Sequence, residues 1–161
     1  MPGDTVMVHH TTITPCQKEY LLAFHKPAGI VCTTSKIDKN NVIDYLNFPE
    51  RIYPVGRLDK ESTGLLLLTN NGQLMDDVLR GSNYHEKEYI VHVNKPITDS
   101  VLQAMAQGVP ILDTITRPCK IRRMGKDCFY ITLTQGLNRQ IRRMCEYSVS
   151  YTHLRAHETL M

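Results

Sequence analysis

Apolar residues recur along the chain in two periods, one typical of strands and one typical of helices. The clearest strand alternates so that Tyr89, Val91 and Val93 share one face. Residues 65–68 are fully apolar and are followed by Asn-Asn-Gly, which predicts a short strand buried on both faces. Strands are predicted at residues 20–24, 30–34, 65–68, 87–93, 111–123 and 128–134, the last two joined around Gly125.

Four other stretches have apolar residues at helical spacing. Thr98 suits the N-cap of one helix and Gly108 suits its end. In the last stretch Ile141, Met144 and Cys145 share one face, so this helix should pack against the core and present Arg139, Arg142 and Arg143 outward. Helices are predicted at residues 41–46, 73–80, 98–107 and 139–147, the last capped by Asn138.

Strands outnumber helices in this pattern, and several neighbouring strands are close enough in sequence to form hairpins. We therefore predict an α+β fold with a mostly antiparallel mixed sheet flanked by short helices. The 161 residues are enough for one domain with a core of its own, and few for two.

Positive charge is concentrated in one part of the sequence. The whole chain carries a formal net charge of +3, but residues 117–143 hold eight basic residues against the single acid Asp127. This segment therefore carries +7 and the remainder −4. Such asymmetry indicates a polyanionic partner, and we expect nucleic acid. A solvated charged face is the alternative interpretation.

The remaining composition argues against several classes of protein. No apolar run approaches the roughly 20 residues of a membrane span, and residues 1–10 lack the pattern of a signal peptide, so we expect a cytoplasmic protein. The five cysteines are scattered without a Cys-x-x-Cys pair, which predicts reduced thiols. His153 and His157 lie four residues apart, but no third ligand stands at a familiar spacing, so we expect no metal site.

One loop carries the candidate chemistry. Asp59 lies between Arg57 and Lys60 in a loop bounded by glycines, directly before the apolar run 65–68. A carboxylate between two cations should stay ionised near neutral pH. An ionised carboxylate held at a turn is a candidate nucleophile or base. An isolated Arg-Leu-Asp would more simply be a surface turn with an ion pair.

Three motifs in order extend this loop to a family resemblance. Residues 56–65, Gly-Arg-Leu-Asp-Lys-Glu-Ser-Thr-Gly-Leu, resemble the catalytic motif of the RNA pseudouridine synthases. Two later runs agree with it, Lys-Glu-Tyr at 87–89 and Gly-Leu-Asn-Arg-Gln-Ile-Arg-Arg-Met at 136–144, and Lys-Pro-Ala-Gly at 26–29 also fits. The third motif resembles the ribosomal RsuA/RluB/RluE/RluF branch, and its surroundings most resemble a large-subunit rRNA enzyme of that branch. The resemblance covers roughly residues 18–147.

The resemblance implies a reaction without a cofactor or metal. A specific uridine in large-subunit (23S) rRNA would lose its N-glycosidic bond, turn, and rejoin the same sugar through carbon. Asp59 would be the catalytic aspartate, acting either by adding to the sugar or by abstracting a proton from it. A pseudouridine synthase catalytic domain is the fold that the resemblance implies.

The resemblance also implies roles for other side chains. Tyr89 would stack on the target base, although a core-facing strand tyrosine fits the same pattern. Arg142 would pair with the carboxylate of Asp59. Arg57 would help to extrude the target nucleotide or occupy its place. Phosphate contacts are expected from Lys60, Lys120, Arg122, Arg123, Arg139 and Arg143.

The resemblance finally divides the chain into three parts. Residues 1–14 resemble only the closing strand of an S4-type RNA-binding domain, residues 15–147 would be an incomplete catalytic domain, and residues 148–161 match no segment of the family. Two alternatives follow from these ends and from the branch. The chain could be a non-catalytic RNA-binding fragment, or a synthase acting on a tRNA uridine. We expect a monomer with rRNA, or else tRNA, as its partner.

Overall fold

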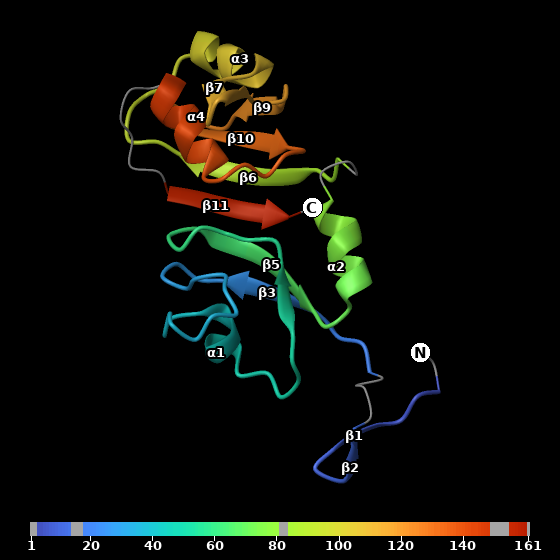
Figure 1. Cartoon of the computed structure of the whole chain (residues 1–161). Coiled ribbons are helices and arrows are strands. Elements are labelled where there is room, and N and C mark those ends of the chain that lie inside the picture. The colour runs from blue at the N-terminus through green and yellow to red at the C-terminus, as the bar shows by residue number, and fades with distance from the viewer. Residues whose placement is uncertain (1–2, 14–17, 81–83, 149–154, 161) are drawn as a thin grey trace.

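The fold is known from a computed structural model that describes residues 3–13, 18–80, 84–148 and 155–160 (Figure 1). The strands are β1 (Val6–Val8), β2 (Thr11–Ile13), β3 (Leu21–Lys26), β4 (Tyr53–Val55), β5 (Thr63–Thr69), β6 (Lys87–His92), β7 (Pro110–Ile111), β8 (Thr114–Ile115), β9 (Lys120–Arg123), β10 (Cys128–Leu133) and β11 (Arg155–Leu160). The helices are α1 (Val42–Leu46), α2 (Gly72–Leu79), α3 (Asp99–Gln107) and α4 (Gln140–Ser148). In this described part of the chain, no helix is both long and apolar enough to cross a bilayer.

A seven-stranded sheet organises the molecule. Six of its strands follow the order β3-β5-β11-β6-β10-β9, and β4 pairs with the end of β5. Every pairing is antiparallel except that of β11 with β5, which is parallel. The predicted α+β fold with a mostly antiparallel mixed sheet is therefore confirmed. Two small hairpins, β1–β2 and β7–β8, stand outside this sheet.

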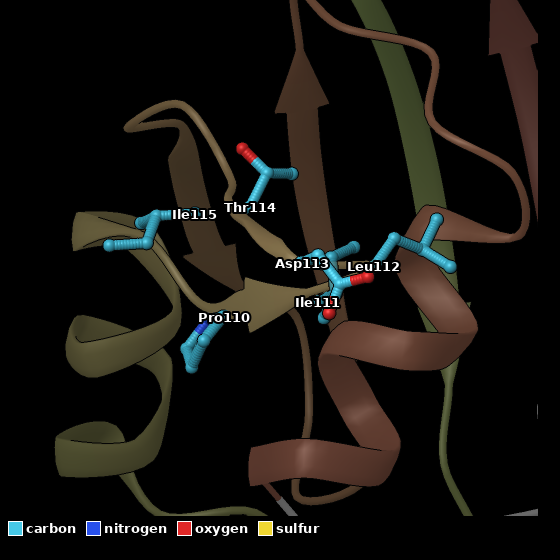
Figure 2. A pocket seen from close by; sticks show the side chains of 6 residues that line it. All are labelled: Pro110, Ile111, Leu112, Asp113, Thr114 and Ile115. Carbon is cyan, nitrogen blue, oxygen red and sulfur yellow. The ribbon is translucent and has the colours of Figure 1, made fainter.

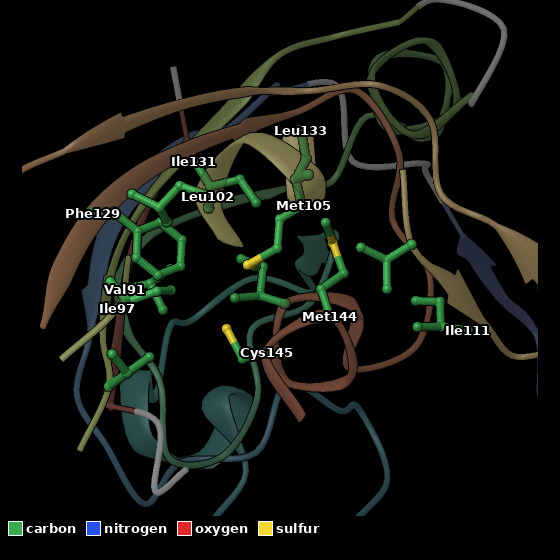
Figure 3. Packing of buried hydrophobic residues seen from close by; sticks show 13 residues of the cluster. Val91, Ile97, Leu102, Met105, Ile111, Phe129, Ile131, Leu133, Met144 and Cys145 are labelled. Atoms are coloured by element: carbon green, nitrogen blue, oxygen red, sulfur yellow. The ribbon is translucent and has the colours of Figure 1, made fainter. Parts of the chain in front are cut away.

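Two separate hydrophobic cores pack against this sheet. The larger core joins α3 and α4 to β6 and β10, and Figure 3 shows Met105, Phe129 and Ile131 converging with Met144 and Cys145 of α4. The smaller core lies between α1 and the β3–β5 half of the sheet, around Leu58, Leu66 and Leu68. Each half of the sheet is thus stabilised by its own helices, and the backbone of β11 joins β5 to β6 between the halves (Figure 1).

Most of the predicted elements exist near their predicted bounds. Asn41, Asn71 and Thr98 cap α1, α2 and α3, each side chain accepting a backbone N–H of the first turn. The prediction that residues 65–68 are buried on both faces is wrong. Leu66 and Leu68 are fully buried, whereas the alternate leucines of β5 are only half-buried.

Two predicted strands are wrong. Residues 30–34 form no strand, because Val31 makes only a single bridge to Asn41. The predicted strand 111–123 is broken into β7, β8 and β9. Leu112 and Asp113 both adopt positive φ, which is the geometry of a tight hairpin turn and ends β7 after two residues.

The start of the last helix also differs from the prediction. Arg139 has a φ of 49° and stands outside the helix, which begins at Gln140. Asn138 does not act as the N-cap among the described contacts; its side-chain oxygen accepts instead from the Arg143 guanidinium at 3.3 Å. The three arginines therefore do not share one outward face. Arg142 points to the loop that contains Asp59, as shown below.

The backbone of β11, near the end of the chain, provides one strand of the main sheet. The backbone of β11 pairs antiparallel with β6 along its whole length and parallel with Thr63 and Gly64 of β5. The side chain of His157 and all of His153 and Cys16 lie outside the described residues. At the other end, β1–β2 forms a hairpin that lies away from the main sheet in Figure 1.

Candidate active site

The loop between β4 and β5 holds Asp59 at the edge of the smaller core. Leu58, immediately before it, is buried in that core, and its backbone N–H donates to the Cys32 sulfur at 3.4 Å. After the aspartate, the Ser62 N–H donates to the Asp59 carbonyl at 3.0 Å and closes a turn that leads into β5. The carboxylate is thus carried by a loop that is fixed on both sides.

A buried lysine stabilises the same loop through hydrogen bonds to its backbone. Lys26 ends β3 and is completely buried, although lysine seldom is. Its Nζ donates to the Pro27 carbonyl at 2.7 Å and to the Lys60 carbonyl at 3.3 Å. The Gly29 N–H donates to the Lys60 carbonyl as well, at 2.7 Å. The Lys-Pro-Ala-Gly segment therefore fixes the residue that follows Asp59.

The carboxylate of Asp59 meets the guanidinium of Arg142. Arg142 Nε donates to Asp59 Oδ2 at 3.1 Å, across 83 residues of sequence. The arginine side chain is 13% exposed and the aspartate side chain 28% exposed, so the pair is shielded but not sealed from water. Arg142 Nη2 also lies 3.7 Å from Glu61 Oε2, a more exposed carboxylate. Charge-assisted bonds of this kind are stronger than neutral ones and fix the orientation of the acceptor.

This ion pair connects the two cores. Asp59 follows a residue of the smaller core, whereas Arg142 lies on α4 beside Ile141, Met144 and Cys145 of the larger core.

Burial raises the pKa of the Cys145 thiol to about 12, and burial likewise raises that of Cys119 to about 11. These thiols consequently remain protonated around neutral pH and behave as apolar core groups.

Tyr89 lies on the face of the sheet that α4 covers. Tyr89 and Val91 are two residues apart on β6, so their side chains lie on the same face of the sheet. Tyr89 is half-buried and packs against the larger core. The register pairs Tyr89 with Glu158 of β11, and Glu158 in turn with Gly64 at the start of β5. Tyr89 therefore shares a cross-strand row with the strand that follows the Asp59 loop.

The basic residues are in different situations. Arg57 and Lys60 flank Asp59 and are exposed, as are Arg122 and Arg139. Arg122 stacks on Tyr130, with its guanidinium carbon 4.1 Å from the ring centre. These four cations are accessible to an anionic ligand.

Other predicted phosphate contacts are occupied by protein groups. Lys120 pairs with Glu86 at 2.7 Å, on the surface. Arg143 donates to the Asn138 carbonyl at 3.0 Å. Arg123 uses all three of its nitrogens, on Asp99, Gly125 and Ile97. Three of the five N–H donors of Arg123 thus bond within the protein, and its phosphate contact stays a prediction.

The sequence prediction missed three residues that shape the site. Lys26 is part of the Lys-Pro-Ala-Gly motif, but the sequence analysis gave it no role of its own. An alternating pattern of apolar and polar residues does not indicate that an ammonium group is buried. Glu61 sits two residues after Asp59, where its contact with Arg142 depends on the distant helix. Gln140 is buried at the start of α4, and its amide is bonded on both sides.

Two hollows in the described surface are lined by residues other than those around Asp59. The larger, of about 500 Å³, is lined by Pro110 to Ile115 of the β7–β8 hairpin (Figure 2). The smaller lies between α3 and β9. No three histidine, cysteine or acidic side chains gather in a metal-binding arrangement within the described residues.

The sequence of the chain is similar to those of known proteins of one family. Residues 20–147 match the RNA pseudouridylate synthase family. The chain is 51% identical over 148 residues to the dual-specificity RNA pseudouridine synthase RluF of Escherichia coli O6:H1 (strain CFT073), covering 91% of this chain and 51% of that protein. It is 31% identical over 153 residues to the ribosomal large subunit pseudouridine synthase B of Bacillus subtilis (strain 168), covering 89% and 62%.

The fold comparison agrees with the sequence comparisons. A crystal structure of a pseudouridylate synthase superposes with a TM-score of 0.78 at 25% identity, covering 91% of this chain and 64% of that one. The present chain spans about half the length of the RluF protein that it matches.

Proposed function

Because this chain belongs to the RNA pseudouridylate synthase family, we propose that it converts a uridine of large-subunit rRNA to pseudouridine, with Asp59 as the catalytic carboxylate. The observation that carries the proposal is the contact between Arg142 Nε and Asp59 Oδ2. Two motifs that are distant in sequence meet there, one on a loop and one on a helix. The bonds to the Lys60 carbonyl fix the loop that carries Asp59.

The chemistry needs a positioned carboxylate and no redox partner. The C1′–N1 bond of uridine breaks, the uracil turns, C5 bonds to C1′, and the proton on C5 leaves while N1 regains one. Atoms and electrons balance within the nucleotide. Asp59 takes part at the sugar, either by adding to C1′ or by removing a proton from the ribose. Arg142 holds its carboxylate in a fixed orientation, which supplies positioning and electrostatic stabilisation.

The neighbouring residues receive roles under the same proposal. Tyr89 stacks on the extruded base, since an aromatic face can hold a flipped base without reading its edges. Arg57 is exposed two residues before Asp59, where it can take the place of the extruded nucleotide. Lys60, Arg122 and Arg139 contact phosphates and supply salt-dependent affinity.

The names of the relatives support the choice of RNA. One relative acts, by its name, on the ribosomal large subunit, and RluF is named as having dual specificity. We therefore propose large-subunit rRNA as the first substrate and a tRNA uridine as a second. The competing function, a non-catalytic RNA-binding fragment, keeps the basic surface but makes no use of the Asp59–Arg142 pair.

Incubation with 23S rRNA and tRNA transcripts tests the proposal. Carbodiimide labelling followed by primer extension maps each new pseudouridine as a stop. We expect a stop in 23S rRNA that Asp59→Ala abolishes while RNA binding is retained. Binding without any stop would instead support the non-catalytic alternative. A stop that persists in Asp59→Ala would show that Asp59 is not the catalytic group.

A further inference from the structure

The turn that begins α4 is closed by one buried side chain. Gln140 is only 5% exposed, and its Oε1 accepts the Leu137 N–H at 3.1 Å. The Gln140 backbone N–H in turn donates to the Leu137 carbonyl at 3.1 Å. The same two residues are therefore joined by two reciprocal hydrogen bonds, which fix the four-residue turn between them.

This turn contains a strained residue. Arg139 has a φ of 49°, a left-handed conformation that residues other than glycine adopt rarely and at some energetic cost. Such a conformation persists when the surrounding contacts determine it. The reciprocal bonds between Leu137 and Gln140 span Arg139 and supply that determination.

The amide of Gln140 is also tied to the sheet. Its Nε2 donates to Gln135 Oε1 at 3.3 Å. The same oxygen accepts the Arg117 N–H at 3.1 Å, and Arg117 Nη1 donates to the Thr134 carbonyl at 3.1 Å. Gln135 Oε1 therefore has two donors, which fix the orientation of that amide and require Gln140 to present its NH₂ group.

We propose that Gln140 is a positioning residue of the active site, whose side-chain amide fixes the start of α4 and thereby sets where the Arg142 guanidinium meets Asp59. This inference rests on the proposed function, because it assigns Gln140 to the same site. The apolar residues of α4 pack the helix against the core but do not fix the position of its first residue. The Gln140 amide fixes that position through its hydrogen bonds, only two residues before Arg142.

The expected consequence is large because catalysis is sensitive to small displacements. A misplacement of about 1 Å in a reacting group can slow a reaction about 100-fold. Gln140→Met keeps the length and apolar stem of the side chain but removes both amide bonds. Gln107→Met, on the exposed last residue of α3, is the matched control outside the site.

The first measurement does not depend on activity. In the full chain labelled with ¹⁵N-arginine, the Arg142 Nε–H is assigned by its loss in Arg142→Lys, and its exchange with water is measured. Loss of one hydrogen bond corresponds to about tenfold faster exchange. We expect that change in Gln140→Met and none in Gln107→Met. Unchanged exchange in a folded Gln140→Met protein would overturn the inference.

A second pair of variants covers a Gln140→Met protein that does not fold. Gln135→Met removes the acceptor of the Gln140 amide, whereas Gln135→Glu retains a side-chain oxygen there. We expect faster Arg142 Nε–H exchange in Gln135→Met and retained protection in Gln135→Glu. Equal exchange in these two variants would also overturn the inference.

The second measurement is the single-turnover rate of pseudouridine formation with saturating rRNA. We expect Gln140→Met to slow it about tenfold or more while the Kd for RNA stays within about twofold. A full rate in Gln140→Met, with an active wild-type protein, would overturn the inference alone. A wild-type protein that binds rRNA without turnover would overturn the proposed function, and the exchange measurement would then decide the role of Gln140.

Discussion

Replacing Arg142 with methionine separates its role in catalysis from its contribution to stability. Methionine preserves an unbranched apolar stem on α4 but removes the guanidinium that contacts Asp59 at 3.1 Å. Hydrogen bonds to charged groups contribute about 1.5–3 kcal/mol.

The effect on stability is expected to be small. The Asp59 side chain is 28% exposed, so its carboxylate regains water when the arginine is lost. We expect a loss of about 1 kcal/mol, at the upper end of the range for ion pairs in contact with water, because this pair is partly shielded. For a chain of this size that corresponds to a Tm lower by about 2–4 °C.

The effect on the rate is expected to be much larger. A carboxylate that has lost its partner is no longer oriented toward the sugar, so most of the bond energy is missing in the transition state. A loss of about 2–3 kcal/mol there slows single turnover about 30- to 160-fold. The assay is release of tritium from rRNA labelled at C5 of uridine, because C5 loses its hydrogen as it bonds to C1′.

Arg143→Met is the matched control for this prediction. Arg143 is the next residue on α4, but it bonds to Asn138 and not to Asp59. We expect it to leave the rate at saturating RNA within about twofold. The reasoning is refuted if Arg142→Met retains a rate within about threefold of the wild type, or if both variants slow equally.

Three further predictions test other parts of the structure. Lys26→Met removes the bonds to the Pro27 and Lys60 carbonyls, so single turnover should slow about tenfold. The Tm should shift by only a few degrees, because the substitution also removes a buried charge. Arg122→Ala should lower the salt slope of RNA binding by about 1. Arg123→Ala should lower the slope by less and also lower Tm, because three of its N–H groups bond within the protein. Burial raises the pKa values of Cys119 and Cys145, so the unfolded chain loses these protons at lower pH than the folded chain does. The free energy of unfolding should therefore fall as the pH rises from about 9 to 11. Urea titrations at each pH measure this, and the fall should be less steep in Cys145→Ala than in the wild type.

The sequence was sufficient to predict the family and most of the secondary structure. Alternation along 87–93 predicted β6, and the predicted N-cap Thr98 is the N-cap of α3. The family inferred from three ordered motifs is confirmed by the match of residues 20–147. These successes share a cause, because local pattern and turn chemistry agree with the tertiary fold at those places.

The errors arose where tertiary contacts override local pattern. The turn at Leu112 and Asp113 contains no glycine, so nothing in the run 111–123 signals its positive φ. Helical spacing placed Arg142 on an outward face, since it cannot show that a loop 83 residues away covers that face. The burial of Lys26 could not be predicted from the sequence either, because one of its acceptors is the Lys60 carbonyl of a distant loop.

Single-turnover tritium release by Asp59→Asn, compared with the wild type, tests the central claim most directly. Asparagine preserves the size of the side chain and its capacity to accept from Arg142 Nε, but it cannot act as a nucleophile or base at the sugar. With both proteins saturated by 23S rRNA, we predict release by the wild type and a rate at least about 1,000-fold lower in the variant. Release by Asp59→Asn within about tenfold of the wild-type rate would contradict the assignment of Asp59 as the catalytic carboxylate.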